Sequence, residues 1–232
     1  MNKSKRQQRL DRKRQEKRRG QMRWVAIISV AAVGLAAMLI FASQVRAPDI
    51  DHDYSQKNGT FLGDPNALVT VIEYGDFQCS HCRNFYATTE GDLIDTYVTT
   101  GQVLYEYRPL NFLGPESTLS AEASLCAADQ NMFWEYHDVV FANFSTGNTG
   151  GYAESRLVEF ASTLNMDVDA FSACLAGGEK SEALAEINVG ADAAGVGGTP
   201  AFLINGKLRS GNIPFADLSA EIEAALNALG AN

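Results

Sequence analysis

Cysteine and histidine are scarce in this chain, and their spacing limits the metal chemistry that it can support. The 232 residues include four cysteines and three histidines. Only Cys79 and Cys82 have C-x-x-C spacing, and no second C-x-x-C or H-x₃-H motif supplies the two further ligands of a zinc site. Arg83 stands where the haem-attachment motif requires histidine. The sequence therefore predicts no metal site and no cofactor at this pair.

The basic N-terminal stretch lacks aromatic residues. Residues 1–23 carry eleven Lys and Arg against Asp11 and Glu16, and no aromatic side chain among them is available to stack on bases. The remaining chain holds 8 basic and 26 acidic residues, so the net charge of −9 combines a basic tail with an acidic domain. Nucleic-acid binding is therefore disfavoured, and the tail fits the cytoplasmic flank of a membrane segment.

Residues 24–42 contain no charged residue, and only Ser29 and Gly34 interrupt the apolar run. About twenty apolar residues in a helix span a bilayer, whereas a secretory signal peptide has an apolar region of about 7–15. Pro48 directly follows the best cleavage candidate and makes it a poor site. We therefore expect an uncleaved single-pass anchor at 24–42 in the cell membrane, with the tail at 1–23 in the cytoplasm and the rest extracytoplasmic.

Residues 43–58 are polar and aperiodic, which predicts a linker between the anchor and an α/β domain at 59–232. Apolar, β-branched runs predict strands, and periodic apolar spacing predicts helices. The expected strands are 60–62, 68–74, 103–108, 201–204 and 207–210, and the expected helices are 79–99, 116–129, 132–144, 154–164, 168–175, 179–194 and 215–229. This order describes a small mixed sheet with a helical insertion at about 115–195.

The apolar run Val69–Tyr74 ends in a short polar turn that leads directly to Cys79. The helix expected from this residue onward places its thiol near a helix N-terminus, where free N–H groups and the helix dipole favour the thiolate and lower the pKa. A purely structural disulfide between Cys79 and Cys82 is disfavoured, because closing so short a loop removes little entropy from the unfolded chain. The pattern thus favours a redox dithiol.

Two further features leave alternatives open. Glu73 is an acid inside an apolar strand; if buried it would have a raised pKa and suit proton exchange with a thiol, but a half-exposed strand residue is equally compatible. Thr199-Pro200 precedes a strand, and a proline at a strand's start can be cis, although only about 5–6% of X–Pro bonds are. The residues alone decide neither question.

Four segments in the right order resemble the DsbA-like thiol:disulfide oxidoreductases, most closely the membrane-anchored bacterial members of the thioredoxin superfamily. They are Leu62-Gly63-Asp64-Pro65, Val71-Ile72-Glu73-Tyr74-Gly75-Asp76-Phe77-Gln78-Cys79-Ser80-His81-Cys82, Phe133-Trp134-Glu135-Tyr136-His137-Asp138 and Gly197-Gly198-Thr199-Pro200-Ala201-Phe202-Leu203-Ile204-Asn205-Gly206. The resemblance runs from about residue 58 to 229. It implies a thioredoxin fold with an inserted helical domain, which agrees with the order of elements above.

The resemblance also implies roles for single residues. Cys79 corresponds to the exposed nucleophile and Cys82 to the buried resolving thiol, while Glu73 matches the family's buried acid. Thr199 and Pro200 match the cis-proline loop that pairs with the backbone of the substrate, a form of strand addition. His81 keeps the group that stabilises the thiolate. Ser80 departs from the Pro-His dipeptide of many DsbA enzymes and leaves the strength of the oxidant open.

Cys126 and Cys174 stand on predicted helices of the insertion. They could be two buried free thiols, but export and an even cysteine count favour a disulfide, and similar family members carry a second pair. We therefore expect a structural Cys126–Cys174 disulfide. His137 lies on an apolar helix face and is interpreted as a core histidine.

The predicted function is that of an extracytoplasmic oxidase that donates the Cys79–Cys82 disulfide to reduced exported proteins. By resemblance, a DsbB-like or vitamin K epoxide reductase-like quinone reductase in the membrane would reoxidise it. We expect a monomer. A disulfide reductase or isomerase of the same fold is the main alternative, and a redox-silent peptide-binding chaperone is another.

Overall fold

The computed structural model describes residues 17–18, 21–22, 24–25, 27–30, 32–34, 45–46 and 52–230. The chain divides into two compact units, Met1–Gln44 and Val45–Asn232. In the first unit the described residues are helical. Among the residues that the structure describes, no helix has the length and apolar character needed to cross a membrane. Much of the expected anchor at 24–42, including all of 35–42, lies outside the described residues, so the anchor stays a prediction.

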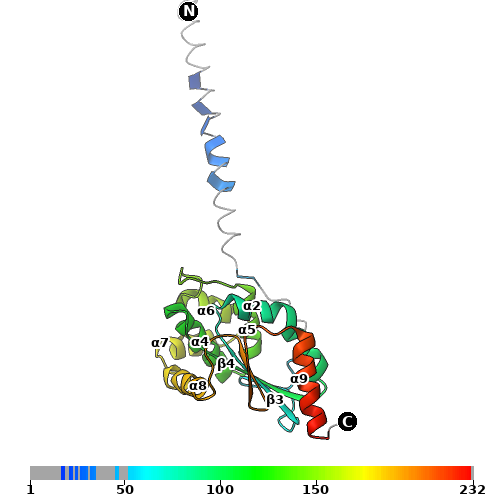
Figure 1. Cartoon of the computed structure of the whole chain (residues 1–232). Coiled ribbons are helices and arrows are strands. Elements are labelled where there is room, and N and C mark those ends of the chain that lie inside the picture. The colour runs from blue at the N-terminus through cyan, green and yellow to red at the C-terminus, as the bar shows by residue number, and fades with distance from the viewer. Residues whose placement is uncertain are drawn as a thin grey trace, which may run out of the picture. The chain divides into compact units, whose positions relative to one another are not determined.

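The second unit is built on a sheet of six strands in the order β1-β2-β4-β3-β5-β6 (Figure 1). The central strands β3 and β4 are parallel, and the other neighbours are antiparallel. The bounds are β1 Lys57–Asn58, β2 Phe61–Leu62, β3 Val69–Gly75, β4 Val103–Pro109, β5 Ala201–Ile204 and β6 Lys207–Ser210. Asn205 and Gly206 join β5 to β6 with φ angles of 46° and 81°, as a type I′ turn requires.

Side chains of β3 alternate between two apolar layers, because successive residues of a strand point to opposite faces. Val69 and Val71 lie in the main core, on the face that Glu73 shares by alternation. Ile72 and Tyr74 belong to a second apolar cluster on the other face, where residues of a helix of the insertion cover the sheet. The alternation therefore directs Glu73 toward the main core, beneath the helix that carries the two cysteines.

One continuous helical segment begins at the dithiol, with Cys79 as its N-cap and Cys82 in its first turn. It consists of α2 (Ser80–Phe85), a π-helical turn at Tyr86–Glu90, α3 (Gly91–Leu93) and a second π-helical turn at Ile94–Val98. The predicted helix at 79–99 is therefore correct in extent but not in regularity. Each π turn fits one extra residue into the helix and changes which side chains face the core.

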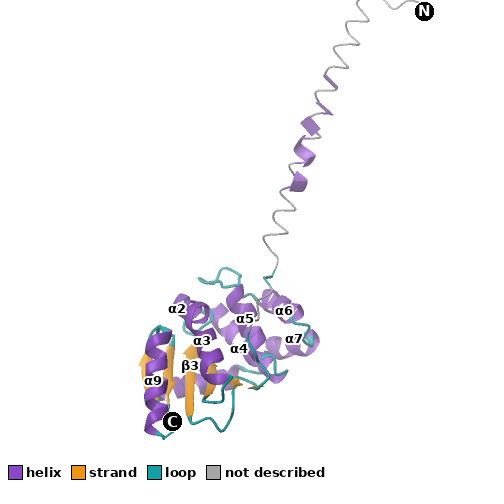
Figure 2. Ribbon diagram, turned by 90° about the vertical axis from the view of Figure 1, so that its right-hand side faces the viewer, coloured by secondary structure: helices purple, strands orange, loops and turns teal. Residues whose placement is uncertain are grey.

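The insertion between β4 and β5 consists of helices and the loops between them (Figure 2), and it covers both faces of the sheet. Phe133 of its second helix joins the main core, as does Leu218 of the C-terminal helix, whereas Ala191 of its last helix packs with Tyr74 on the opposite face. The bounds are α4 Pro115–Asp129, α5 Phe133–Ala142, α6 Glu154–Thr163, α7 Val168–Ala176, α8 Ser181–Ala193 and, after the sheet, α9 Phe215–Ala228. Each lies within a few residues of the helix expected from the sequence. The thioredoxin-type arrangement with a helical insertion is thus present.

The described part of the expected linker at 43–58 is not a free tether. Tyr54 is buried and its hydroxyl donates a 2.8 Å hydrogen bond to Asp138 Oδ2. The backbone of Arg46 exchanges two 2.8 Å hydrogen bonds with the side chain of Asn143. This docking is not predictable from the sequence, because single polar contacts leave no periodic pattern.

Candidate active site

The turn between β3 and the dithiol is fixed by one buried carboxyl group. Asp76 Oδ1 accepts a hydrogen bond from the Gln78 N–H at 2.8 Å, and Oδ2 accepts bonds from the Phe112 N–H at 2.9 Å and the Ser117 hydroxyl at 2.6 Å. The Asp76 N–H in turn lies 3.5 Å from Cys82 Sγ, toward which it points. Asp76 thus ties the dithiol to the loop after β4 and to the first turn of α4.

Cys79 is the N-cap residue of α2, with an extended backbone, and its side chain is 8% exposed. A hydrogen bond from Cys82 is the main reason that the pKa of the Cys79 thiol falls to about 5; the Thr199 side chain and the backbone N–H groups of Cys82 and His81 add to this, and burial opposes it. At neutral pH the sulfur is therefore a thiolate, which is the nucleophilic form.

Cys82 has the opposite character. It is 1% exposed, and burial together with its hydrogen bond to Cys79 and the nearby charge of Glu73 raises the pKa of its thiol well above the usual value. Both cysteines are free thiols in this structure. The pair thus consists of one stabilised thiolate near the surface and one buried group that holds its proton.

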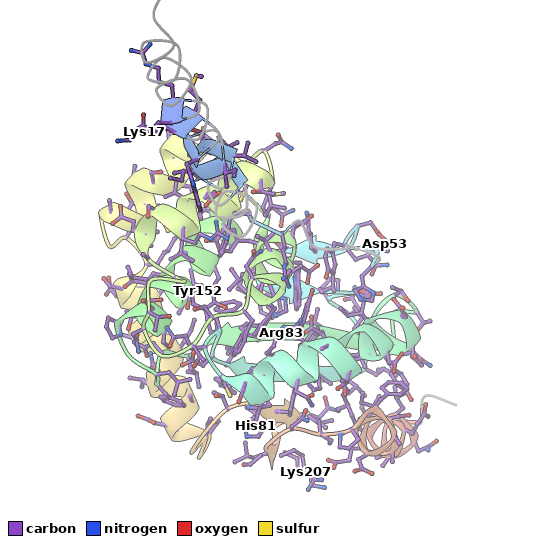
Figure 3. The ribbon with its side chains drawn as sticks, turned by 90° about the horizontal axis from the view of Figure 1, so that it is seen from above. Lys17, Asp53, His81, Arg83, Tyr152 and Lys207 are labelled. Carbon is purple, nitrogen blue, oxygen red and sulfur yellow. A yellow bond between two sulfur atoms is a disulfide. The ribbon has the colours of Figure 1, made fainter. Side chains whose placement is uncertain are left out.

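His81 lies on the first turn of the α2 segment, exposed to solvent, and Arg83 follows on the same segment (Figure 3). The backbone N–H of His81 helps to lower the pKa of Cys79. Its imidazole forms no hydrogen bond or ion pair with the described residues, so the contribution that the structure shows comes from its main chain. A role for the ring stays a prediction.

The loop before β5 meets the dithiol from the other side. The Thr199–Pro200 peptide bond is cis, and Cys79 Sγ lies 3.4 Å from the carbonyl oxygen of Thr199. A cleft of about 480 Å³ opens here, lined by Cys79, Phe112, Leu113, Asp192, Val196, Gly197, Gly198 and Thr199. Phe112 and Leu113 are 49% and 42% exposed. An extended peptide could therefore place apolar side chains beside the reactive sulfur.

Glu73 is buried beneath the dithiol, with 1% of its surface exposed. Burial raises the pKa of its carboxyl group to about 8, even though a 2.5 Å hydrogen bond from the Tyr105 hydroxyl opposes the rise; the negative charge of Cys79 adds to it. The alternative of a half-exposed strand residue is therefore wrong. A carboxyl group with a pKa near neutrality suits proton exchange with a buried thiol.

Cys126 and Cys174 are joined by a disulfide that links α4 to α7, with a Cα–Cα distance of 6.0 Å. It lies within the helical insertion and contributes no group to the cleft. Among the predicted site residues, the structure thus brings together Cys79, Cys82 and Thr199, with Glu73 below them, and places this disulfide apart.

Sequence reasoning missed three residues of the site. Asp76 lies in a polar turn, where acids are common, and its position three residues before the first cysteine is the one signal that points to it. Tyr105 and Glu90 gave no signal, since an aromatic residue in a strand and an acid in a helix are both common. His137, interpreted as a core histidine, is indeed fully buried, but it lies beside Glu90 and Asp138.

Comparisons with known proteins agree with this geometry. A family model described as thioredoxin matches residues 55–224. The chain is 34% identical over 178 residues to the Na(+)/H(+) antiporter NhaA 1 of Salinispora arenicola, a match that covers 77% of this chain and 25% of that protein. The chain therefore spans about a quarter of the length of this curated relative.

Two further similarities are to a curated bacterial protein and to a solved bacterial structure. The chain is 28% identical over 169 residues to the probable disulfide bond formation protein D of Bacillus anthracis, covering 71% of this chain and 77% of that protein. The oxidised structure of BdbD from Bacillus subtilis matches with a TM-score of 0.69 at 21% identity, over 76% of this chain and 97% of that one, which shows the shared fold. With its dithiol at the end of β3 and its helical insertion, the chain belongs to the thioredoxin family.

Proposed function

We propose that this chain is an oxidase, which donates the Cys79–Cys82 disulfide to reduced exported proteins. The observation that carries the proposal is the unequal pair of thiols, with the pKa of Cys79 near 5 and that of Cys82 raised. A low pKa stabilises the thiolate and hence the reduced form of the dithiol. A stable reduced form makes the disulfide a good electron acceptor.

The size of this effect follows from general constants. Between the pKa and the ambient pH, each unit of pKa depression stabilises the reduced form by about 1.4 kcal/mol. For a two-electron couple that corresponds to about 30 mV in the oxidising direction. A reductase would gain from a less stabilised thiolate, so the depressed pKa of Cys79 favours the oxidase over the reductase or isomerase.

The proposed reaction has two exchange steps. A substrate thiolate attacks Cys79 Sγ and forms a mixed disulfide, while the Cys79–Cys82 bond breaks and Cys82 leaves as a thiolate. The carboxyl group of Glu73 gives this sulfur a proton, as its burial and raised pKa allow. A second substrate thiolate then attacks the substrate sulfur of the mixed disulfide. The substrate departs with its new disulfide, and Cys79 remains as a thiolate.

The cleft beside Thr199 supports binding of an unfolded chain rather than of one small molecule. Gly197 and Gly198 are exposed, and a Cβ added to either would meet no atom within 4 Å, so the backbone there is open to a peptide. Main-chain pairing gives affinity for any extended segment, and apolar walls such as Phe112 and Leu113 tolerate many side chains. Low selectivity suits a donor of disulfides to many exported proteins.

The location and partners belong to the same proposal. The uncharged run at 24–42 behind a basic tail supports a single-pass anchor with the dithiol domain outside the cytoplasm. The Cys126–Cys174 disulfide supports an oxidising compartment. A DsbB-like or vitamin K epoxide reductase-like quinone reductase in the same membrane would return the dithiol to its disulfide form. The domain acts as a monomer.

The proposal is tested by mixing the oxidised chain with a reduced peptide that holds two thiols. We expect rapid formation of the peptide disulfide by the wild-type chain and none by Cys79→Ser. A chain that instead reduces an oxidised peptide in a glutathione buffer would be a reductase. The chaperone alternative predicts that Cys79→Ala leaves the effect of the protein in cells unchanged, whereas the oxidase predicts its loss.

A further inference from the structure

Glu90 is a second acid buried near the dithiol. It ends the π-helical turn that follows α2 and is 2% exposed. The Tyr105 hydroxyl, which donates a 2.5 Å bond to Glu73 Oε2, also lies 3.4 Å from Glu90 Oε2. One hydroxyl has a single proton, so it can donate to Glu73 while it accepts from a protonated Glu90. The two acids are thus joined by a group that can both take up and release a proton.

A histidine and an aspartate continue this row beyond Glu90. His137 Nε2 lies 3.7 Å from Glu90 Oε2 and has no hydrogen-bond partner, although it is fully buried. Its other ring nitrogen, Nδ1, lies 3.5 Å from Asp138 Oδ1. The Tyr54 hydroxyl donates a 2.8 Å bond to Asp138 Oδ2 at the outer end of the row. Tyr54 is 7% exposed, so the row runs from the dithiol toward the surface.

Titratable groups from several neighbouring elements act on Glu90. They are Glu73 on β3, Tyr105 and Tyr107 on β4, His137 and Asp138 on α5, Tyr86 on its own helical segment and Tyr54 before β1. No lysine or arginine is among them. Burial and the negative charges of Glu73 and Asp138 raise the pKa of Glu90 well above its usual value, and burial lowers the pKa of His137.

Resting on the oxidoreductase function proposed above, we propose that Glu90 relays protons for the reaction: it exchanges a proton with Glu73 through the Tyr105 hydroxyl and with the surface through His137, Asp138 and Tyr54. Glu90 does not contact the sulfur atoms. It acts through Glu73, whose described hydrogen-bond partner is Tyr105. The residue is thus a relay for the buried acid.

When Cys82 leaves as a thiolate, it takes the proton of Glu73 and becomes a thiol, and Glu73 becomes a carboxylate. Tyr105 then passes its hydroxyl proton to Glu73 and takes one from Glu90, so that the tyrosine is unchanged and Glu90 carries the negative charge. The Tyr54 hydroxyl then passes its proton to Asp138 and takes one from solvent, Asp138 passes that proton to Nδ1 of His137, and the N–H at Nε2 gives its proton to Glu90. Each acid and hydroxyl ends in its starting protonation state, and the histidine changes tautomer. In reoxidation the same transfers run in reverse.

The experiment measures the rate at which glutathione reduces the Cys79–Cys82 disulfide from pH 5 to 9, with acid quench and alkylation of the new thiols. We expect Glu90→Gln and Tyr105→Phe each to slow the reaction at pH 7 by roughly tenfold. Because the two residues serve one route, the double variant should be no slower than the slower single variant. The solvent deuterium isotope effect should rise in all three, since proton transfer then limits the rate.

Glu116→Gln is the matched control, because Glu116 is also a buried glutamate but its carboxyl group accepts hydrogen bonds from the N–H groups of Gly150 and Tyr152. It should react at the wild-type rate. The equilibrium constant with glutathione at pH 7 should stay within about threefold in every variant, which separates a slower proton route from a damaged site.

Three results would overturn the relay. The first is a rate within twofold of wild type in Glu90→Gln at every pH. The second is a double variant whose rate is slowed by the product of the two single-variant factors, because the two residues would then act independently. The third is a rate that falls when the wild-type chain is treated with EDTA, because ligand atoms of Glu90, His137 and Asp138 lie within 4.8 Å of one another and would then be holding a cation. Failure of the wild-type disulfide to react with glutathione at all would instead refute the proposed function.

Discussion

Cys79 Sγ lies 3.4 Å from the carbonyl oxygen of Thr199, a residue 120 positions further along the chain. The antiparallel pairing of β3 with β5 creates this contact, since it places Tyr74 opposite Ala201 and Glu73 opposite Phe202. The nucleophile, the substrate loop and the buried acid are therefore held by neighbouring residues of two paired strands. The long helical insertion leaves this arrangement undisturbed, because it begins and ends outside both strands.

The thiol of Cys79 should titrate near pH 5. We expect the rate of alkylation of the reduced chain by iodoacetamide to rise with a midpoint close to this value, since only the thiolate reacts. Cys82→Ala removes the largest cause of the low pKa and should move the midpoint upward by about one pH unit or more. A midpoint that stays near 5 in this variant would show that Cys82 does not stabilise the thiolate.

Glu73→Gln should stabilise the reduced chain at alkaline pH. The folded-state pKa of Glu73, about 8, lies above the unfolded value, so the native state binds its proton more tightly. This contribution to stability is complete below about pH 4.5 and is lost as pH rises through about 8. Glutamine cannot lose a proton. The unfolding free energy of the variant minus that of the wild type should therefore be larger at pH 8.5 than at pH 4.5, by on the order of a few kcal/mol.

Urea denaturation at these two pH values measures the gain. The exposed acid Glu186 supplies the control, because Glu186→Gln should change the unfolding free energy equally at both. A difference in unfolding free energy between wild type and Glu73→Gln that is the same at both pH values would show that folding does not raise the pKa of Glu73.

The Cys126–Cys174 disulfide should contribute to stability and not to catalysis. Its residues are 48 positions apart, and closing a loop of that size constrains the unfolded chain by about 4 kcal/mol. We expect Cys126→Ala/Cys174→Ala to lose about this much unfolding free energy, measured by denaturant titration. The variant should still oxidise a dithiol peptide at the wild-type rate below its unfolding transition, whereas a tenfold slower reaction would assign the disulfide a part in catalysis.

Gly75 is required by the position of a tyrosine side chain. A Cβ at this residue would lie 2.2 Å from the Tyr107 hydroxyl oxygen and 2.6 Å from the adjacent ring carbon. Gly75→Ala should therefore cost about 1–3 kcal/mol of unfolding free energy. Tyr107→Phe removes the nearest atom but not the ring, so the double variant should recover part of this loss. If the loss in the double variant equals the sum of the losses in the two single variants, the clash is not the cause.

The elements and the dithiol were predictable from the sequence because their signals are local. The apolar run that ends at Tyr74, the C-x-x-C spacing and the period of the inserted helices each lie within one short segment. The pairing of Asn205 and Gly206 as a hairpin turn is similarly local. The resemblance to a family added the roles of Glu73 and Pro200, which residue chemistry alone left undecided.

The remaining features depend on contacts between distant segments. Glu90 approaches Tyr105 only because a π-helical turn rotates it into the core, and helical periodicity does not predict such a turn. Tyr54 reaches Asp138 across 84 positions of sequence. The motif predicts a role for the His81 ring, and the structure places His81 in solvent, so that this role stays a prediction.

The most direct test of the oxidase is the reduction potential of the Cys79–Cys82 couple, measured at pH 7 by equilibrium with glutathione and separation of the alkylated forms. With the pKa of Cys79 near 5, we expect a value well above the roughly −270 mV of thioredoxin and toward the roughly −120 mV of DsbA. The exposed Ser80 can be replaced by proline, the residue of many DsbA enzymes, as a comparison variant. A potential close to that of thioredoxin would contradict the account and make the chain a reductase.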